Sequence, residues 1–146
     1  RRFGEKTGAG FYTYTDAKAE PVSAIVQRLQ EAGEVPTGTE FSVDRLILPF
    51  LNEAAMCVQE DIANVNDVDM ACIAGIGMQV NRNGELVRMG PLEYMDEMGL
   101  DVVVEKLENL EKQFGPRFHP TEILYQKVRA KELGKKSGRG FMEWTA

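Results

Sequence analysis

"SVDRLILPFLNEAAMCVQEDIAN", residues 42–64, predicts one long α-helix. Ser42 stands at its start, where a hydroxyl side chain can accept a hydrogen bond from a free backbone N–H. Apolar residues recur at the helical spacing and predict one buried stripe made of Ile47, Phe50, Leu51, Ala54, Val58 and Ile62. Pro49 lies within this stripe. Because proline lacks an N–H and its ring crowds the carbonyl one turn earlier, we expect a kink there.

Polar residues on this helix are the first candidates for function. On a helical wheel, Asp44 shares a side with three apolar residues, Leu48, Leu51 and Ala55. If this side of the helix lined a pocket, the Asp44 carboxylate would face into that pocket. A structural role also explains Asp44, because it lies in the first turn of the helix, where the helix dipole stabilises an acid. Asn52 and Glu53 follow on the flank, where a polar pair is typical of a solvated or hydrogen-bonded face.

Glycines, prolines and apolar spacing divide the rest of the chain into shorter helices. We expect helices from Asn66 to Gly77, from Pro91 to Gly99, from Asp101 to Gly115, and from Pro120 onward. Asn66 and Asp101 would act as N-caps, and Asp67 and Asp69 would lie in the first turn of their helix. Within residues 78–89, an Asn-Gly pair predicts a small hairpin.

Towards the N-terminus, Pro21 is expected to open a short helix that Gly33 closes, with Val22, Ile25, Val26 and Leu29 on one face. Residues 33–39 have no periodicity and predict a linker. No segment alternates with a period of two over any length. The predicted fold is all-α: a compact bundle of five to six helices with glycine-rich extended tails and at most one small hairpin.

The two ends of the chain carry the same phrase. "GEKTGAGFYTY", residues 4–14, recurs as "GKKSGRGFMEW", residues 134–144, with one constant offset between matched positions. The sequence separation between matched residues, such as Gly4 and Gly134, is about the length of one domain. We therefore expect the tail of one repeated domain to precede a complete second domain. Neither copy has phosphate-loop spacing. We expect the glycines to turn the backbone, and Phe11 or Phe141 to pack on a helical body.

Composition excludes several classes of protein. The net charge of −6 argues against a nucleic-acid partner. The longest run without a charged residue, 70–81, is too short to span a membrane, which takes about 18 apolar residues. The chain opens without Met or a signal segment, so we expect a fragment of a longer protein. Cys57 and Cys72 are expected to be ordinary buried thiols in a reducing compartment.

His119 is the single histidine of the chain. Catalysis by histidine needs an orienting acid and a nucleophile or substrate. The neighbouring sequence supplies neither, so we expect His119 to be structural or solvated. The chain also lacks His-Glu-x-x-His, paired-cysteine and EF-hand spacings, so no metal site is expected.

Four motifs occur in order: "DRLILPFLNEA", "DVDMACIAGIG", "GPLEYMDEMGLD" and "GKKSGRGFMEW". Together they resemble the helical C-terminal domain of 3-hydroxyacyl-CoA dehydrogenases. That domain begins with an Asn-Arg-Leu-x-x-Pro helix and ends in a Gly-Lys-Lys-Thr/Ser-Gly-x-Gly-Phe tail. The likeness covers residues 42–144 as one copy, and residues 4–14 resemble the tail of a preceding copy.

The resemblance implies a domain order and an activity. Residues 1–14 would be the tail of a preceding helical copy, residues 15–41 a short helix and linker, and residues 42–146 the second of two tandem copies. The parent would oxidise L-3-hydroxyacyl-CoA to 3-ketoacyl-CoA with NAD in fatty acid β-oxidation. A Rossmann domain outside this chain would bind NAD and carry the catalytic histidine and its glutamate. The helical domain would supply dimer contacts and part of the acyl-CoA cleft.

Asp44 departs from the family pattern, because it stands where the family has a substrate-holding asparagine. A carboxylate lacks the donor that an amide offers. We therefore expect that Asp44 is an altered substrate-binding position. Because the Rossmann domain and the catalytic histidine would lie outside it, we also expect that the 146-residue chain alone binds no cofactor and is not catalytic. We also expect a cytoplasmic parent, and a homodimer of the isolated chain. The alternative is a non-catalytic helical module for self-association or interaction.

Overall fold

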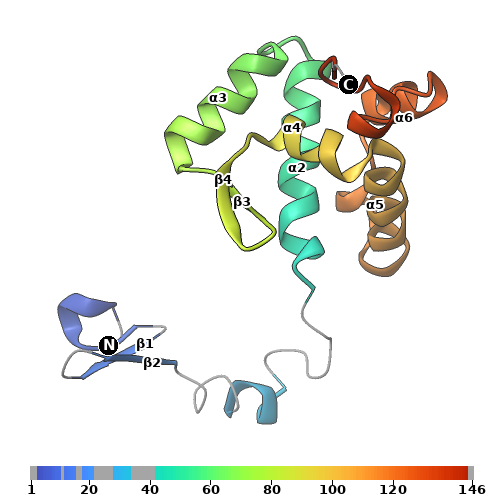
Figure 1. Cartoon of the computed structure of the whole chain (residues 1–146). Helices are drawn as coiled ribbons and strands as arrows, with labels where there is room; N and C mark the ends of the chain where they lie inside the picture. The colour runs from blue at the N-terminus through green and yellow to red at the C-terminus, as the bar shows by residue number, and fades with distance from the viewer. Residues whose placement is uncertain (1–2, 11, 16–17, 22–27, 34–41, 145–146) are drawn as a thin grey trace. The chain divides into compact units, whose positions relative to one another are not determined.

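The computed structural model of the protein describes residues 3–10, 12–15, 18–21, 28–33 and 42–144 (Figure 1). The chain divides into two compact units, residues 1–41 and 42–146.

The unit that begins at residue 42 is a helical bundle, which confirms the predicted fold class. Its described residues form five α-helices: α2 (Asp44–Gln59), α3 (Val65–Ile76), α4 (Pro91–Met98), α5 (Leu100–Phe114) and α6 (Glu122–Arg129). Two 3-10 turns, η2 (Pro116–Phe118) and η3 (Lys135–Ser137), follow α5 and α6. Figure 1 shows α2 running through the middle of this unit, with α3 on one side and α5 and α6 on the other.

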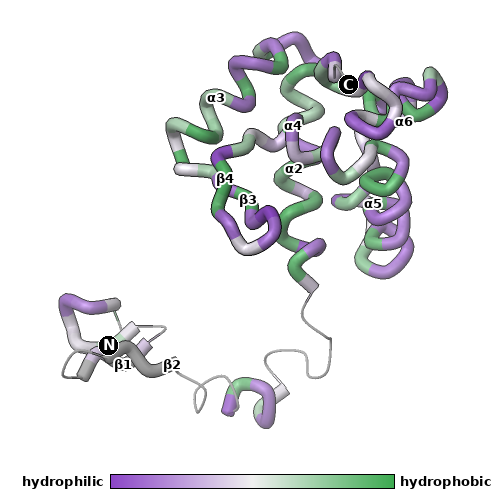
Figure 2. The backbone as a smooth tube through the Cα atoms, viewed as in Figure 1, coloured by the Kyte–Doolittle hydropathy of each residue, from purple (hydrophilic) through white to green (hydrophobic). Residues whose placement is uncertain are grey.

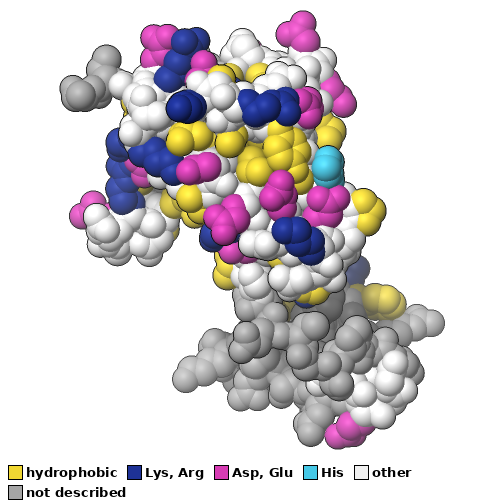
Figure 3. Space-filling view, turned by 90° about the vertical axis from the view of Figure 1, so that its right-hand side faces the viewer, with side chains coloured by type: hydrophobic (Ala, Val, Ile, Leu, Met, Phe, Trp, Pro, Cys, Tyr) yellow, Lys and Arg dark blue, Asp and Glu magenta, His cyan; other side chains and the backbone are white. Residues whose placement is uncertain are grey.

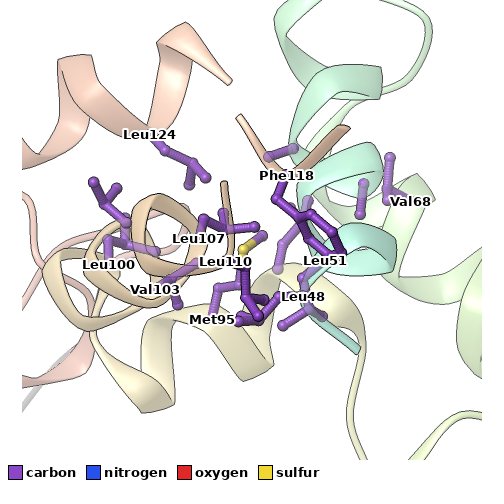
Figure 4. Packing of buried hydrophobic residues seen from close by; sticks show 14 residues of the cluster. Leu48, Leu51, Val68, Met95, Leu100, Val103, Leu107, Leu110, Phe118 and Leu124 are labelled. Atoms are coloured by element: carbon purple, nitrogen blue, oxygen red, sulfur yellow. The ribbon is translucent and has the colours of Figure 1, made fainter. Parts of the chain in front are cut away.

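The core lies where α2, α4, α5 and α6 meet (Figure 4). Leu48, Leu51 and Ala55 of α2 are completely buried. The predicted stripe was therefore partly wrong, since Ile47 is 36% exposed and Ile62 is 69% exposed. Apolar residues surround the N-terminal half of α2, so spacing alone could not select the buried side. The other core residues are Ala54, Val68, Leu92, Met95, Leu100, Val103, Val104, Leu107, Leu110, Phe118 and Leu124.

α2 is shorter than the sequence predicted. Its N-cap is Val43, one residue after the expected cap Ser42, and no side chain caps this end. At the other end, Asp61 takes a left-handed conformation with φ 55°. The next N–H, of Ile62, then donates to the Cys57 carbonyl at 3.0 Å. This closure resembles the turn that glycine usually makes after a helix, and it ends α2 before the expected end at Asn64. The helix continues through Pro49.

Two predicted N-caps, Asn66 and Asp101, each lie two residues after the cap in the structure. Asn64 rather than Asn66 caps α3, because its Oδ1 accepts from the N–H of Asp67 at 3.0 Å. α5 begins directly after Gly99, so Asp101 lies in the first turn rather than at the cap. Several neighbouring Asn and Asp residues satisfy the same preference, and local sequence does not choose among them.

The predicted hairpin is confirmed between α3 and α4. β3 (Gln79–Arg82) pairs antiparallel with β4 (Glu85–Arg88). Asn83 and Gly84 both have positive φ, 54° and 92°, as a two-residue turn of this hand requires. Gly77, at φ 67°, ends α3 just before the hairpin, as expected.

The unit of residues 1–41 contains a second hairpin, which the sequence did not predict. β1 (Tyr12–Thr15) pairs antiparallel with β2 (Lys18–Pro21). Pro21 thus ends a strand, and the prediction that it opens a helix was wrong. Residues 28–31 are helical, but the remainder of the predicted helix and most of the predicted linker fall on residues 22–27 and 34–41, outside the described residues. Phe11 is outside them as well.

The surface of the helical unit mixes apolar and charged regions. Figure 2 shows hydrophobic residues along much of the α2 backbone, where Leu48, Leu51 and Ala55 are buried, and in the C-terminal part of α3. On α3, Met70 is 61% exposed and Ile76 is 69% exposed. On the face in Figure 3, Lys and Arg side chains lie beside Asp and Glu. None of the helices in the described ranges is long and apolar enough to cross a membrane.

Candidate functional site

Asp44, the predicted site residue, is the first residue of α2 and forms an ion pair. Its Oδ2 accepts a hydrogen bond from Nζ of Lys106 on α5 at 2.9 Å. The side chains are 43% and 40% exposed, so water solvates both charges. The next residue, Arg45, places its guanidinium 3.9 Å from the ring centre of Phe114, also on α5. Asp44 and Arg45, at the start of α2, therefore both contact side chains of α5.

A pocket of about 420 Å³ opens near the other end of α2. It is lined by Asn52, Glu53, Met56, Gln59, Pro116, Arg117, His119, Pro120, Thr121 and Glu122. Asn52, the pocket residue of α2 nearest to Asp44 in the sequence, lies more than two helical turns from it, a rise of about 12 Å. Asp44 and this pocket are thus separate places on the fold. The lining carries both signs of charge, which does not favour a strongly charged ligand.

His119 lies at this pocket and has an acid partner that sequence reasoning missed. Its Nδ1 is 3.0 Å from both carboxylate oxygens of Glu111, in the last turn of α5. The Glu111 carboxylate holds one ring nitrogen, which leaves Nε2 as the nitrogen that this pair does not use. A histidine oriented in this way can transfer protons if a substrate group comes within hydrogen-bond reach. The side chain of His119 is 62% exposed, as expected for a solvated histidine.

Asn52 fixes the chain around His119. This side chain is only 4% exposed. Its Nδ2 donates to the His119 carbonyl, and its Oδ1 accepts from the Thr121 N–H, both at 2.9 Å. Thr121 is the N-cap of α6, so the helix begins slightly later than the expected start at Pro120. The predicted polar pair is thus divided between two roles, since Asn52 is buried and bonded while Glu53 is exposed beside the pocket.

Asp69 forms a second buried polar contact, between α3 and α4. Its two carboxylate oxygens accept from the N–H groups of Leu92 and Glu93 at 2.8 and 3.0 Å, which caps the start of α4. Burial raises the pKa of the Asp69 carboxyl, although these hydrogen bonds oppose the shift. A Cβ at Gly90 would lie 2.2 Å from the Asp69 Cγ, so this close approach needs glycine. The sequence explained Asp69 as a first-turn acid and missed this contact.

Asp96, on α4, holds the glycine-rich tail. It is completely buried. Its carboxylate accepts from the N–H groups of Phe141 and Met142 and from the indole N–H of Trp144, each at 2.9 Å. A Cβ at Gly140 would lie 2.1 Å from Asp96 Oδ1. The predicted packing of Phe141 on the helical body is observed, since its ring packs partly buried against the core.

Surface ion pairs reinforce the docking of the tail. Glu97 of α4 pairs with both Arg82 of the β3–β4 hairpin and Lys135 of η3. Hydrogen bonds from Arg82 and then Lys135 lower the pKa of the Glu97 carboxyl. Asp101 pairs with Lys136, whose ammonium lowers the pKa of that carboxyl. Through Glu97, α4 thus connects the β3–β4 hairpin with the tail.

The described residues bring no three His, Cys, Asp or Glu side chains together as a metal ion would need. Cys57 and Cys72 are free and half-buried. Burial raises the pKa of the Cys72 thiol, and the carboxylate of Asp69 raises it further. This thiol therefore stays protonated near neutral pH and is a poor nucleophile.

Comparison with known proteins identifies the helical unit. The model of the 3-hydroxyacyl-CoA dehydrogenase C-terminal domain family matches residues 41–144. The chain is 38% identical over 129 residues to the fatty acid oxidation complex subunit alpha of Idiomarina loihiensis, covering 86% of this chain and 17% of the relative. It is 37% identical over 102 residues to a 3-hydroxybutyryl-CoA dehydrogenase of Mycobacterium tuberculosis, covering 69% of this chain and 32% of the relative.

A crystal structure of M. tuberculosis FadB2 has the same fold, with a TM-score of 0.65 and 30% identity, over 86% of this chain and 44% of that chain. The chain therefore spans less than half the length of each of these relatives. The resemblance drawn from the four ordered motifs is confirmed for the helical unit. The chain belongs to the family of 3-hydroxyacyl-CoA dehydrogenase C-terminal domains.

Proposed function

We propose that this chain is part of an NAD-dependent 3-hydroxyacyl-CoA dehydrogenase. The parent oxidises L-3-hydroxyacyl-CoA to 3-ketoacyl-CoA in fatty acid oxidation, most simply in the cytoplasm. Support comes from the family match over residues 41–144 and from relatives named for fatty acid oxidation and 3-hydroxybutyryl-CoA dehydrogenation. NAD binds to a Rossmann domain elsewhere in the parent.

Within that enzyme, this copy supports structure rather than chemistry. The observation that carries this proposal is the ion pair between Asp44 and Lys106 at 2.9 Å. At the position where the family has a substrate-holding asparagine, the side chain here bonds to its own domain. An ionised aspartate accepts hydrogen bonds but donates none, so it does not replace the amide. Asp44 therefore marks an altered substrate-binding position.

The parent carries two such helical domains in tandem, and this one is the second. Support for the tandem order is the phrase of residues 4–14, which recurs at 134–144. The preceding copy and the Rossmann domain are then partners within the same chain. In the parent, the acyl-CoA substrate lies against the preceding copy.

The second candidate function is a helical self-association module, favoured by the exposed apolar side chains of α3. Met70 and Ile76 are 61% and 69% exposed. Exposed apolar surface of this kind is typical of an interface. The preceding copy covers it in the parent, and in the isolated chain a second molecule does, which gives a homodimer.

NADH oxidation with acetoacetyl-CoA tests both parts of the proposal. The full-length parent should turn over, and the 146-residue chain should neither bind NAD nor turn over. In the parent, Asp44→Asn should leave kcat within about twofold, because this position no longer contacts substrate. Turnover by the isolated chain, or a large loss of kcat in Asp44→Asn, would contradict the structural role. An inactive parent that still self-associates would support the second candidate.

A further inference from the structure

The repeated phrase folds into the same loop at both ends of the chain. The N–H of Gly4 donates to the Ala9 carbonyl at 2.8 Å, and the N–H of Gly134 donates to the Arg139 carbonyl at 2.8 Å. Thr7 Oγ1 donates to the Gly4 carbonyl, as Ser137 Oγ donates to the Gly134 carbonyl, both at 3.0 Å.

The backbone angles and the loop ends agree as well. Gly4 has φ 91° and ψ −159°, and Gly134 has φ 89° and ψ −151°. The N–H of Tyr14 bonds to the Gly8 carbonyl at 2.9 Å, as the N–H of Trp144 bonds to the Gly138 carbonyl at the same distance. The likeness of the two phrases therefore extends from sequence to hydrogen bonding.

The two loops differ in what lies against them. A Cβ at Gly134 would meet the Asp96 carbonyl oxygen at 2.3 Å, because α4 packs directly on this loop. A Cβ at Gly4 would meet nothing within 4 Å. Gly10, like Gly140, is required within the loop itself, since a Cβ there would lie 2.8 Å from the Gly4 Cα. The N-terminal loop thus keeps the glycines of a docked tail, although the positive φ of Gly4 favours glycine there whatever packs against it.

Apolar side chains of the N-terminal loop are also exposed where their counterparts are covered. Phe3 is 61% exposed and Tyr14 is 36% exposed. The matching residues, Leu133 and Trp144, are half-buried against the helical unit. An apolar surface on so small a loop is typical of a segment that packs on a partner.

We infer that the loop of residues 3–14 docks on a buried aspartate of a preceding helical segment, as residues 133–144 dock on Asp96. The receptor aspartate lies as far before Gly4 in the parent as Asp96 lies before Gly134 in this chain. It stands on a short helix that packs against the loop. Where the receptor aspartate lies in the parent is inferred from the proposed tandem order. That the loop binds a carboxylate is inferred only from the likeness of the loops of residues 3–14 and 133–144.

A loop exchange within this chain tests the chemistry. In the chimera, the sequence GEKTGAGFYTY replaces residues 134–144. We expect one cooperative thermal transition by circular dichroism. The Tm should fall by roughly 5–10 °C, because a tyrosine cannot supply the indole donor of Trp144 and because glutamate replaces Lys135, the partner of Glu97. Asp96→Asn should lower the Tm of the chimera further, just as it should lower the Tm of the original chain.

Two matched variants sharpen this test. A chimera with the same residues in scrambled order, and one carrying Gly10→Ala in the transplanted sequence, should both lose the cooperative transition. The inference is overturned if the chimera unfolds like the scrambled one, or if Asp96→Asn leaves its Tm unchanged.

The coding sequence of the parent gives an independent test. Aspartate at the position that corresponds to Asp96 in the preceding copy supports the inference. A preceding helical copy with an apolar or basic residue there overturns the inference and leaves the tandem proposal intact. Absence of any preceding helical copy overturns the tandem proposal itself, while the chimera still decides whether the loop is a ligand for a carboxylate.

Discussion

The Asp96 carboxylate accepts a hydrogen bond from the indole N–H of Trp144 at 2.9 Å, across 48 residues of sequence. Together with the N–H groups of Phe141 and Met142, this bond makes one side chain the acceptor for three of the last four described residues of the tail. The stability of the helical unit should therefore depend on Asp96 more than on any surface charge.

Asp96→Asn should lower the free energy of unfolding by about 2–4 kcal/mol, because the amide turns an NH₂ group toward buried N–H donors and leaves them unsatisfied. The shape of the side chain is otherwise kept. Urea unfolding followed by circular dichroism measures the loss. Glu105→Gln, an exposed position on α5, is the matched control and should stay within about 0.5 kcal/mol. A similarly small loss for Asp96→Asn would refute this role.

Trp144→Phe should cost about 1.5–3 kcal/mol, the usual contribution of a hydrogen bond to a charged group. In a double-mutant cycle with Asp96→Asn, the two losses should not add, because both variants break the same bond. Additivity would mean that Trp144 is held by packing alone. Since Trp144 is the single tryptophan of the chain, its fluorescence should also shift to the red in Asp96→Asn.

Asn52→Ala should destabilise the unit by about 2–4 kcal/mol, because it leaves the buried Thr121 N–H and the His119 carbonyl unsatisfied. Asn52→Asp keeps the acceptor for Thr121 and loses only the donor, so its loss should reverse partly as the new carboxyl is protonated at low pH. Urea midpoints at two pH values distinguish the variants. The neighbouring exposed position provides the control, Glu53→Gln, for which no change is expected.

Removing the Asp44–Lys106 pair should have a small effect. The two side chains are 43% and 40% exposed, and solvent-exposed ion pairs typically contribute about 0–1 kcal/mol. Lys106→Met should therefore change the unfolding free energy by no more than about 1 kcal/mol, and the change should shrink in high salt. Lys112→Met, also exposed on α5, serves as the comparison. If Lys106→Met lowered the unfolding free energy by clearly more than exposed ion pairs contribute, the pair would not be a solvent-screened surface contact.

Asp69 should make stability fall as pH rises. Burial holds the pKa of its folded-state carboxyl above the usual value, so the folded state binds this proton more tightly than the unfolded state. The contribution is fully present below the unfolded pKa and is lost as pH rises through the folded pKa. Relative to Asp69→Asn, the wild-type chain should gain stability as pH falls from neutral into the range where carboxyl groups titrate. Urea titrations of both proteins across this range would show a constant difference if Asp69 titrated normally.

Local signals in the sequence predicted the features that depend on neighbouring residues. The Asn83-Gly84 turn was confirmed because its positive φ angles are a local requirement. The end of α4 at Gly99 was confirmed for the same reason. The predicted position of a cap failed wherever two similar residues stood close together, as Asn64 and Asn66 do.

Buried polar contacts were the part that local patterns could not supply. Asp69 and Asp96 accept from N–H groups that lie 23 to 48 residues later in the chain. A carboxylate on a helix looks the same in sequence whether it faces water or another helix. Glu111 was missed as the partner of His119 because it lies on α5, eight residues earlier, and the turn through η2 brings the two side chains together. Ordered family motifs located the domain, but only the fold shows which motif residues make contacts.

The long reach from Asp96 to Trp144 also sets when this domain can finish folding during synthesis. α4 leaves the ribosome well before the tail that covers its buried acid. Until residues 141–144 emerge, the Asp96 carboxylate lacks the N–H groups from which it accepts in the folded domain. Emergence of residues 141–144 is then the step that lets this domain close, and a chain cut before them would keep a buried acid without its donors.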